Sequence, residues 1–109
     1  NRSEFVNTAD QIKDSLRQAQ WLALNRRQSH RLKGEFGKLL LQRKNNDSYE
    51  TFLEENLPDK ISISATRWPS FSAFGFAAGG TITLETEYYI TKVVVSPIGR
   101  IRQTEILKK

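Results

Sequence analysis

An apolar stripe at helical spacing runs along the start of the chain and constrains the fold more than any other feature of the sequence. Its members follow one another at intervals of four, three, four, three and four residues: Phe5, Ala9, Ile12, Leu16, Ala19 and Ala23. This spacing places all of them on one face of a continuous α-helix. Acidic residues early in the segment, and Arg26 and Arg27 late in it, suit the helix dipole. We therefore expect a helix from about Ser3 to Gln28 that packs through this stripe against a sheet.

No clear N-cap precedes the stripe. Thr8 and Gln11 have the spacing of a capping box, but the stripe already begins at Phe5, before that box.

The segment that follows the helix predicts short strands. Alternating apolar and polar residues indicate strands at Ser29–Lys33 and Lys38–Arg43, joined by a turn at Gly34–Gly37. Asn45–Ser48 is a polar break. Tyr49–Leu57 has mixed apolar spacing, so we expect a short helical turn or irregular segment there.

The middle of the chain predicts one strand and one loop. Isoleucines alternate with serines over Ile61–Ser64, which indicates a strand. Arg67–Ser72 is expected to be a loop that carries Trp68. Phe74 and Phe76 are expected to enter the sheet on one face, because they are two residues apart.

The C-terminal part predicts a glycine corner and an antiparallel hairpin. At Gly75, Gly79 and Gly80 the chain can take positive φ angles without penalty. Strand-type runs follow at Thr81–Glu85 and Tyr88–Ser96, and the sequence of Ser96–Gly99 suits a type I turn. The last strand is then expected to begin with Arg100, Ile101 and Arg102.

Together these elements predict an α+β fold in which one long N-terminal helix packs on an antiparallel β-sheet. The chain has 109 residues, which fits a single domain over residues 1–109, with the helix in 1–28 and a β-rich head in 29–109. It has no Cys, which excludes disulfides, thiolate zinc sites and cysteine nucleophiles. No apolar run is long enough to span a bilayer.

Charge is unevenly distributed along the chain. Arg17–Lys44 is rich in basic residues, whereas Asp47–Asp59 contains acidic residues and no basic one. These segments are expected to face one another, either within the fold or between subunits. The net charge of +5 permits acidic partners such as nucleic acid or anionic lipid, although a mildly basic surface is more often only a solubility feature.

A run of motifs resembles the GspH/FimT pseudopilins, which are minor pilin-like subunits of type II secretion systems, type IV pili and DNA-uptake pseudopili. The first motif, F-x-F-x-x-G-G-x-I-x-L, is matched from Phe74 to Leu84. The run Val93–Ser96 and the closing G-R-I-R of Gly99–Arg102 match two further motifs. Leu16–Arg26 resembles the family's L-x-x-A-R-x-x-A-x-x-R segment, with Gln20 where Arg is common.

The resemblance implies a pilin-like fold and a structural role in a filament. Residues 1–28 would be the C-terminal half of a pilin helix whose transmembrane half precedes Asn1. The subunit would sit in the bacterial inner membrane and then enter a periplasmic or extracellular filament. It would lie at or near the filament tip and prime assembly with other major and minor pilins. Trp68 and Phe71 are candidate subunit contacts, with packing back onto the sheet as the alternative.

The resemblance also supports a second hypothesis, that of a minor pilin that binds double-stranded DNA during natural transformation. Arg100 and Arg102 are expected to project from one face of a strand, about 6.6 Å apart. Lys108 and Lys109 extend this basic tail. These four residues are the candidate DNA-binding site, because basic side chains can follow phosphates without reading sequence. The alternative is that the charges are simply solvated.

An enzymatic function has little support in the sequence. His30 is the only histidine, and among basic neighbours we expect it to be a surface residue. No phosphate-binding loop, nucleophile elbow or useful carboxylate cluster is present. We expect no catalytic residue, metal ion or cofactor, and we interpret Glu54–Glu55 and the pair Glu85 and Glu87 as solvated or as partners of basic residues.

Overall fold

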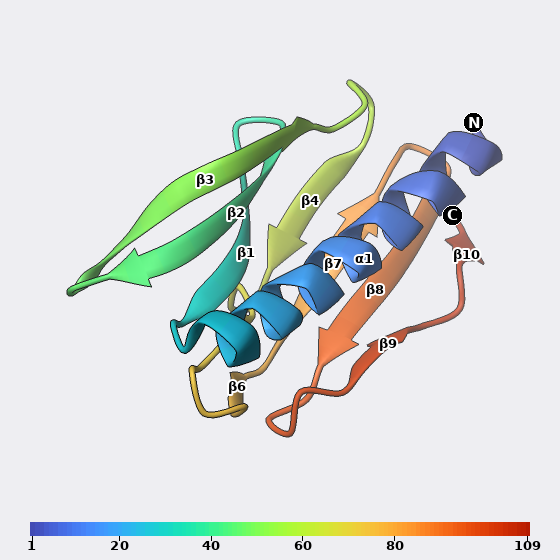
Figure 1. Cartoon of the computed structure of the whole chain (residues 1–109). Helices are drawn as coiled ribbons and strands as arrows, with labels where there is room; N and C mark the ends of the chain where they lie inside the picture. Colours follow the sequence, from blue (N-terminus) through green and yellow to red (C-terminus); the bar gives the residue numbers. More distant parts are fainter.

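A single helix, α1 (Arg2–Arg26), lies across two antiparallel sheets in the computed structural model, which describes residues 1–109 (Figure 1). The strands are β1 (His30–Glu35), β2 (Lys38–Asn45), β3 (Ser48–Asn56), β4 (Ser62–Ala65), β5 (Ser70–Phe71), β6 (Ala77–Ala78), β7 (Gly80–Glu85), β8 (Tyr89–Val95), β9 (Ile101–Gln103) and β10 (Leu107–Lys108). The expected α+β architecture, with a long N-terminal helix on antiparallel sheets, is confirmed.

The predicted helix is also confirmed, and all six residues of its apolar stripe are fully buried. Asn1 is an N-cap that was not expected from the sequence. Its side chain accepts a hydrogen bond from the Glu4 N–H at 2.8 Å. Thr8 is not a cap. Its hydroxyl donates to the Glu4 carbonyl within the helix. The helix ends at Arg27, which takes a left-handed conformation (φ 53°) while its N–H bonds to the Ala23 carbonyl.

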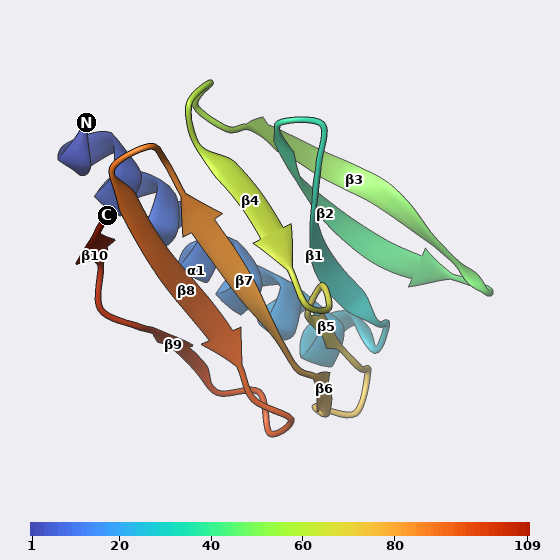
Figure 2. The same ribbon diagram turned by 180° about the vertical axis from the view of Figure 1, so that it is seen from behind.

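The two sheets lie side by side. The first has the strand order β3-β2-β1-β5-β6, and the second has β10-β8-β7-β4, with β9 also paired to β8. No backbone ladder joins β1 to β4, where the sheets meet. Side chains fill this seam instead. The Ile63 and Trp68 side chains pack so closely on Gly34 that a Cβ atom there would lie only 2.8 Å from each of them. Viewed from behind, the outer faces of both sheets carry no covering element (Figure 2).

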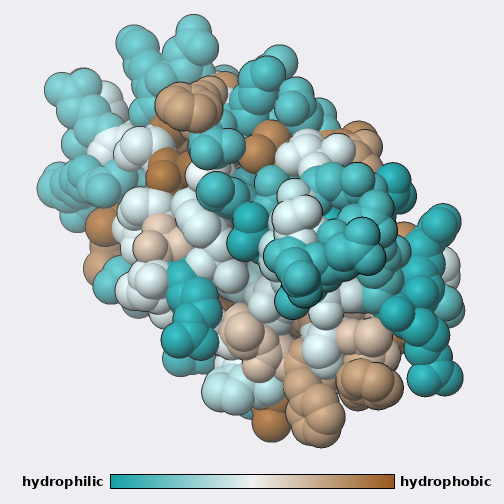
Figure 3. All heavy atoms as spheres, turned by 90° about the vertical axis from the view of Figure 1, so that its left-hand side faces the viewer, coloured by the Kyte–Doolittle hydropathy of each residue, from teal (hydrophilic) through white to brown (hydrophobic).

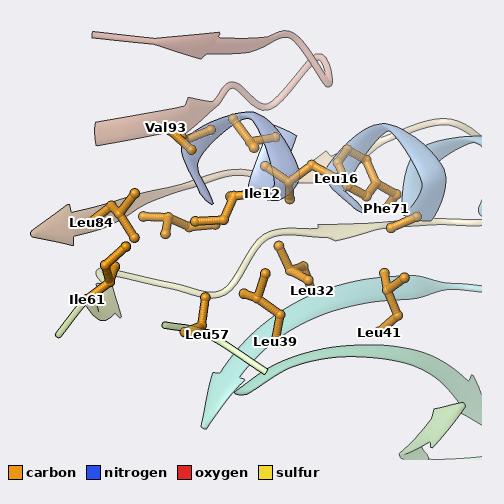
Figure 4. Packing of buried hydrophobic residues seen from close by; sticks show 14 of the residues in the cluster. Ile12, Leu16, Leu32, Leu39, Leu41, Leu57, Ile61, Phe71, Leu84 and Val93 are labelled. Atoms are coloured by element: carbon orange, nitrogen blue, oxygen red, sulfur yellow. The ribbon is translucent and has the colours of Figure 1, made fainter. Parts of the chain in front are cut away.

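One hydrophobic core lies between the helix and both sheets (Figure 4). Ile12 and Leu16 of α1 meet Leu32 of β1 and Leu84 and Val93 of the second sheet in the same cluster. The helix therefore holds the two sheets together, since it buries one face against both of them.

The expectation of a helical turn or irregular segment at Tyr49–Leu57 was wrong, because Ser48–Asn56 forms strand β3, which pairs with β2 along its whole length. A bulge explains the misleading spacing. Leu41 pairs with Leu53 but Gln42 pairs with Thr51, so Phe52 is an extra residue that breaks the alternation.

The expectation that Phe74 and Phe76 enter the sheet was also wrong. Both side chains are exposed in the turn between β5 and β6, where Gly75 has a φ of 90°. Gly79 and Gly80 do not take positive φ angles. They are required for close approach, since a Cβ atom would lie 2.4 Å from the Val95 carbonyl oxygen at Gly79 and 2.1 Å from the Arg67 carbonyl oxygen at Gly80.

The basic and acidic segments do face one another within the fold. Across the β2–β3 pair, the Lys38 Nζ lies 3.4 Å from the Glu54 Oε2, and the Arg43 Nε lies 2.8 Å from the Glu50 Oε1. Arg43 and Asn45 both donate to Glu50, and these hydrogen bonds lower the pKa of its carboxyl group.

Candidate functional site

The tight turn before the basic C-terminal segment is held by four hydrogen bonds. The Gly99 N–H donates to the Ser96 carbonyl at 2.9 Å, as expected for a turn over Ser96–Gly99, and Gly99 has a φ of 84°. The Ser96 hydroxyl accepts from the Arg100 N–H, and the Ser96 N–H donates to the Arg100 carbonyl. The Gln20 amide donates to the Gly99 carbonyl at 3.0 Å, so the turn is fastened to α1.

Arg100 and Arg102 lie on the outer side of the second sheet. Arg100 precedes β9 rather than lying within it, and Arg102 pairs with Val94 of β8. Both arginines are exposed, whereas Ile101 between them packs against the core. Lys92 is two residues from Val94 on β8 and is exposed on the same face. None of these three basic side chains has an ion-pair partner within 4.0 Å.

Lys108 and Lys109 lie at the other end of β8, so the four predicted DNA-binding residues do not form one patch. Strand β10 pairs Lys108 with Tyr89, five residues along β8 from the partner of Arg102, which corresponds to about 17 Å. Lys109 is also partly neutralised, because its Nζ lies 2.6 Å from a Glu85 carboxylate oxygen. The structure brings together Arg100 and Arg102, but it separates them from the terminal lysines.

Phe71 does not lie at the surface, so the structure contradicts its assignment as a candidate subunit contact. Its side chain is 2% exposed within the core, and β5 pairs it with His30. Trp68 is half-buried and packs against the core at the seam near Gly34 and Ile63. For both residues, the structure agrees with the alternative of packing onto the sheet.

The only histidine is buried, which corrects the expectation of a surface residue. His30 is 1% exposed, its Nδ1 lies 2.7 Å from the Gln28 carbonyl oxygen, and its ring meets Phe52 edge-on. The acidic pairs are engaged with neighbouring side chains or solvated: Glu54 contacts Lys38, Glu85 contacts Lys109, and Glu55 accepts from Gln11. No group of three or more His, Asp and Glu side chains is placed to hold a metal ion.

One surface was missed by the sequence analysis. At the end of the molecule where α1 finishes, exposed apolar side chains project from three adjoining segments: Leu24 of the helix, Phe74 and Phe76 of the β5–β6 turn, and Ile98 of the Ser96–Gly99 turn. Figure 3 shows apolar side chains gathered at the corresponding lower end. The sequence signal was a glycine between two phenylalanines, which is typical of a turn as well as of a strand.

Sequence comparisons identify no relative of this chain. No protein-family model matches it, and neither does any curated protein sequence.

Solved structures, in contrast, share its whole architecture. The minor pseudopilin EpsH from the type 2 secretion system of Vibrio cholerae aligns with a TM-score of 0.78 and 10% identity, over 93% of this chain and 96% of EpsH. The type IV minor pilin FimU of Pseudomonas aeruginosa (strain PAO1) aligns with a TM-score of 0.78 and 14% identity, over 95% of this chain and 90% of FimU.

These alignments establish that the chain has the pilin fold. The GspH/FimT-like fold expected from the sequence motifs is therefore confirmed, and its variant is the one found in the minor pseudopilin EpsH and the minor pilin FimU. Helix α1, the one helix of the structure, is too polar to cross a membrane.

Proposed function

We propose that the chain is a minor subunit of a type IV pilus or a type II secretion pseudopilus. The observation that carries this proposal is the fold: EpsH and FimU are minor subunits, and each aligns over more than nine-tenths of this chain.

In this proposal the subunit is held in the bacterial inner membrane by an apolar half-helix N-terminal to α1, and it then enters a periplasmic or extracellular filament. It assembles with major and minor pilins at or near the tip, where it primes assembly.

The test is mass spectrometry of filaments sheared from the source organism, together with deletion of the gene. We expect the chain to co-purify with the major pilin and the number of filaments to fall on deletion. Normal filaments that lack the chain, in cells that express it, would contradict the proposal.

A second candidate function, compatible with the first, is binding of double-stranded DNA. The observation that favours it is the pair Arg100 and Arg102, exposed beside Lys92 and free of ion pairs. Such a basic surface binds phosphates through release of counterions, so its affinity depends strongly on salt.

The structure allows a matched test, because the two halves of the predicted site are far apart. Binding of a random-sequence duplex is measured by fluorescence anisotropy at two salt concentrations. The double variant Arg100→Ala/Arg102→Ala should lose affinity and reduce the salt slope by about two, whereas Lys108→Ala/Lys109→Ala should change it less. No binding at low salt, or equal binding by the arginine variant, would exclude this role for the arginines.

A further inference from the structure

The exposed apolar surface at the end of α1 is formed by three segments that the fold holds in place. We call it the apical patch and define it by Leu24, Phe74, Phe76 and Ile98. Phe74, Phe76 and Ile98 are 78%, 72% and 83% exposed. The two phenylalanines alone expose roughly 200–400 Å², given the usual area of an aromatic side chain. The largest contiguous apolar patch on a monomeric protein is often a functional surface.

The turn that presents the phenylalanines is tightly hydrogen-bonded. The Ser72 hydroxyl accepts from the N–H groups of both Phe74 and Phe76, at 3.3 and 3.1 Å. The Gly75 N–H donates to the Ser72 carbonyl, and the Ser72 N–H donates to the Phe76 carbonyl. The backbone therefore holds both rings outward, which lowers the ordering cost when a partner binds.

Hydrogen bonds and a packing contact also connect the three segments of the patch to one another. The Ala77 N–H donates to the Pro97 carbonyl, which links the β5–β6 turn to the turn that carries Ile98. Gln20 donates to the Gly99 carbonyl, which links that second turn to α1. Leu24 contacts the backbone at Gly75, where a Cβ atom would lie 3.3 Å from its Cδ2. Trp21 lies one helical turn before Leu24 and extends the apolar surface.

The charges around the patch have one sign. None of the chain's 12 acidic residues falls in the segments 15–34, 60–84 and 88–104, which supply the end of α1, both turns and their strands. Arg26 and Arg27 end the helix beside Leu24, and Arg100 follows the turn of Ile98. None of these arginines has an ion-pair partner within the molecule. A complementary surface would be apolar at its centre and acidic at its rim.

We propose that the apical patch docks a second, different pilin-like subunit through an apolar surface bordered by carboxylates. The identity of the partner as a subunit rests on the proposed function. The patch lies at the opposite end of the molecule from the N-terminus of α1 (Figure 1), so in the proposed membrane-held subunit it would face away from the membrane. A protein partner is favoured over double-stranded DNA, because a duplex could contact the arginines through its phosphates but would leave the apolar centre of the patch uncovered.

The experiment uses the 109-residue chain and, as probes, the purified soluble domains of the pilin-like proteins encoded by the source organism. Binding of each probe is measured by calorimetry for the wild type, Phe74→Ser/Phe76→Ser and Arg26→Glu/Arg100→Glu. The matched control is Phe36→Ser, because Phe36 is 94% exposed in the β1–β2 turn and lies outside the patch. Far-UV circular dichroism and thermal melting verify that each variant is folded.

We expect one probe to bind, the Phe74→Ser/Phe76→Ser variant to weaken its binding at least tenfold, and Phe36→Ser to remain within twofold of the wild type. The arginine reversal should also weaken binding, and Lys substitutions at acidic positions of the probe should restore it. Binding within twofold of the wild type by Phe74→Ser/Phe76→Ser would overturn the proposal.

Other outcomes separate this proposal from the proposed function. If the chain is found in sheared filaments but no probe requires the patch, the docking surface alone is wrong. If the chain is absent from filaments and binds no probe, the proposed function fails and the partner with it. Self-association or duplex DNA binding that the phenylalanine variant abolishes, without binding of any probe, would assign the patch to a different occupant and overturn the proposal.

Discussion

Substitution of Gly80 tests whether the glycine corner is needed for close approach of two backbone segments rather than for unusual φ angles. Gly80 has no positive φ, and a Cβ atom there would lie 2.1 Å from the Arg67 carbonyl oxygen and 3.0 Å from the carbonyl carbon. Both obstacles are backbone atoms between β4 and β5, so Gly80→Ala forces the second sheet away from that connection.

The expected magnitude follows from two opposing terms. Overpacking against a neighbour that cannot rotate away costs about 3 kcal/mol, the upper part of the usual range. Replacement of glycine also restricts the unfolded chain, which offsets up to about 1 kcal/mol. We therefore expect Gly80→Ala to lower the free energy of unfolding by about 2–3 kcal/mol. In a domain of this size that corresponds to a fall in Tm of roughly 10–20 °C.

Urea denaturation, followed by tryptophan fluorescence and circular dichroism, measures this effect. Asn is the residue that separates the two explanations, because Asn tolerates positive φ better than Ala does. At Gly75, where φ is 90°, Gly75→Asn should be less destabilising than Gly75→Ala. At Gly80 the larger Asn should be no better than Ala. A Gly80→Ala variant within about 0.5 kcal/mol of the wild type, or rescue by Gly80→Asn, would refute the reasoning.

Three other predictions concern a core side chain, a turn hydrogen bond and an exposed carboxylate. Phe71→Ala should reduce the free energy of unfolding by about 3–5 kcal/mol because it empties a core position, whereas Phe36→Ala should stay within about 0.5 kcal/mol; equal effects in chemical denaturation would contradict the placement of Phe71. Ser72→Ala should lose about 0.5–1 kcal/mol and speed hydrogen exchange at the Phe74 and Phe76 amides, since it removes their shared acceptor; unchanged exchange would contradict that contact. Hydrogen bonds from Arg43 and, second, from Asn45 lower the pKa of Glu50 in the folded state, so its stabilising contribution is present above the ordinary pKa of a glutamate carboxyl group and is lost as pH falls through the lower folded value. The stability difference between the wild type and Glu50→Gln should therefore be constant at neutral pH and shrink in acid, and a difference that grows on acidification would contradict this sign.

The parts of the fold that could be predicted from the sequence are those whose pattern is local and long. The stripe from Phe5 to Ala23 repeats through about five turns of helix. Strands β7 and β8 combine alternation with a strong turn at Ser96–Gly99. Strand β3 could not be recognised, because the bulge at Phe52 breaks its alternation and its nine residues are stabilised by pairing with β2. At Phe74 and Phe76 the opposite error occurs: a strand is expected where the structure has a turn, because both a strand and a turn around Gly75 place two phenylalanines two residues apart.

The candidate site was harder to predict because its arrangement depends on contacts between distant segments. Arg100 and Arg102 are both exposed on either side of Ile101, and this alternation is local, although Arg100 precedes β9 instead of lying within it. Whether Lys108 and Lys109 join them depends on where β10 pairs. It returns to the far end of β8, beside Tyr89, and Glu85 of β7 then meets Lys109. No pattern within the C-terminal segment contains that information.

The same long-range contacts explain how the folded molecule acquires two ends that differ in charge, although the charged residues are scattered along the sequence. Its acidic residues lie in the first half of α1, at the end of β1, in β3 and the turns on either side of it, and at Glu85, Glu87 and Glu105. The acid-free segments are separated in sequence, yet the hydrogen bonds from Gln20 to Gly99 and from Ala77 to Pro97 bring them together where α1 finishes. Repulsion among Arg26, Arg27 and Arg100 is tolerated there because all three side chains are solvated. An acidic partner would relieve that repulsion while it covers Phe74 and Phe76, so charge and apolar burial favour association at the same end of the molecule.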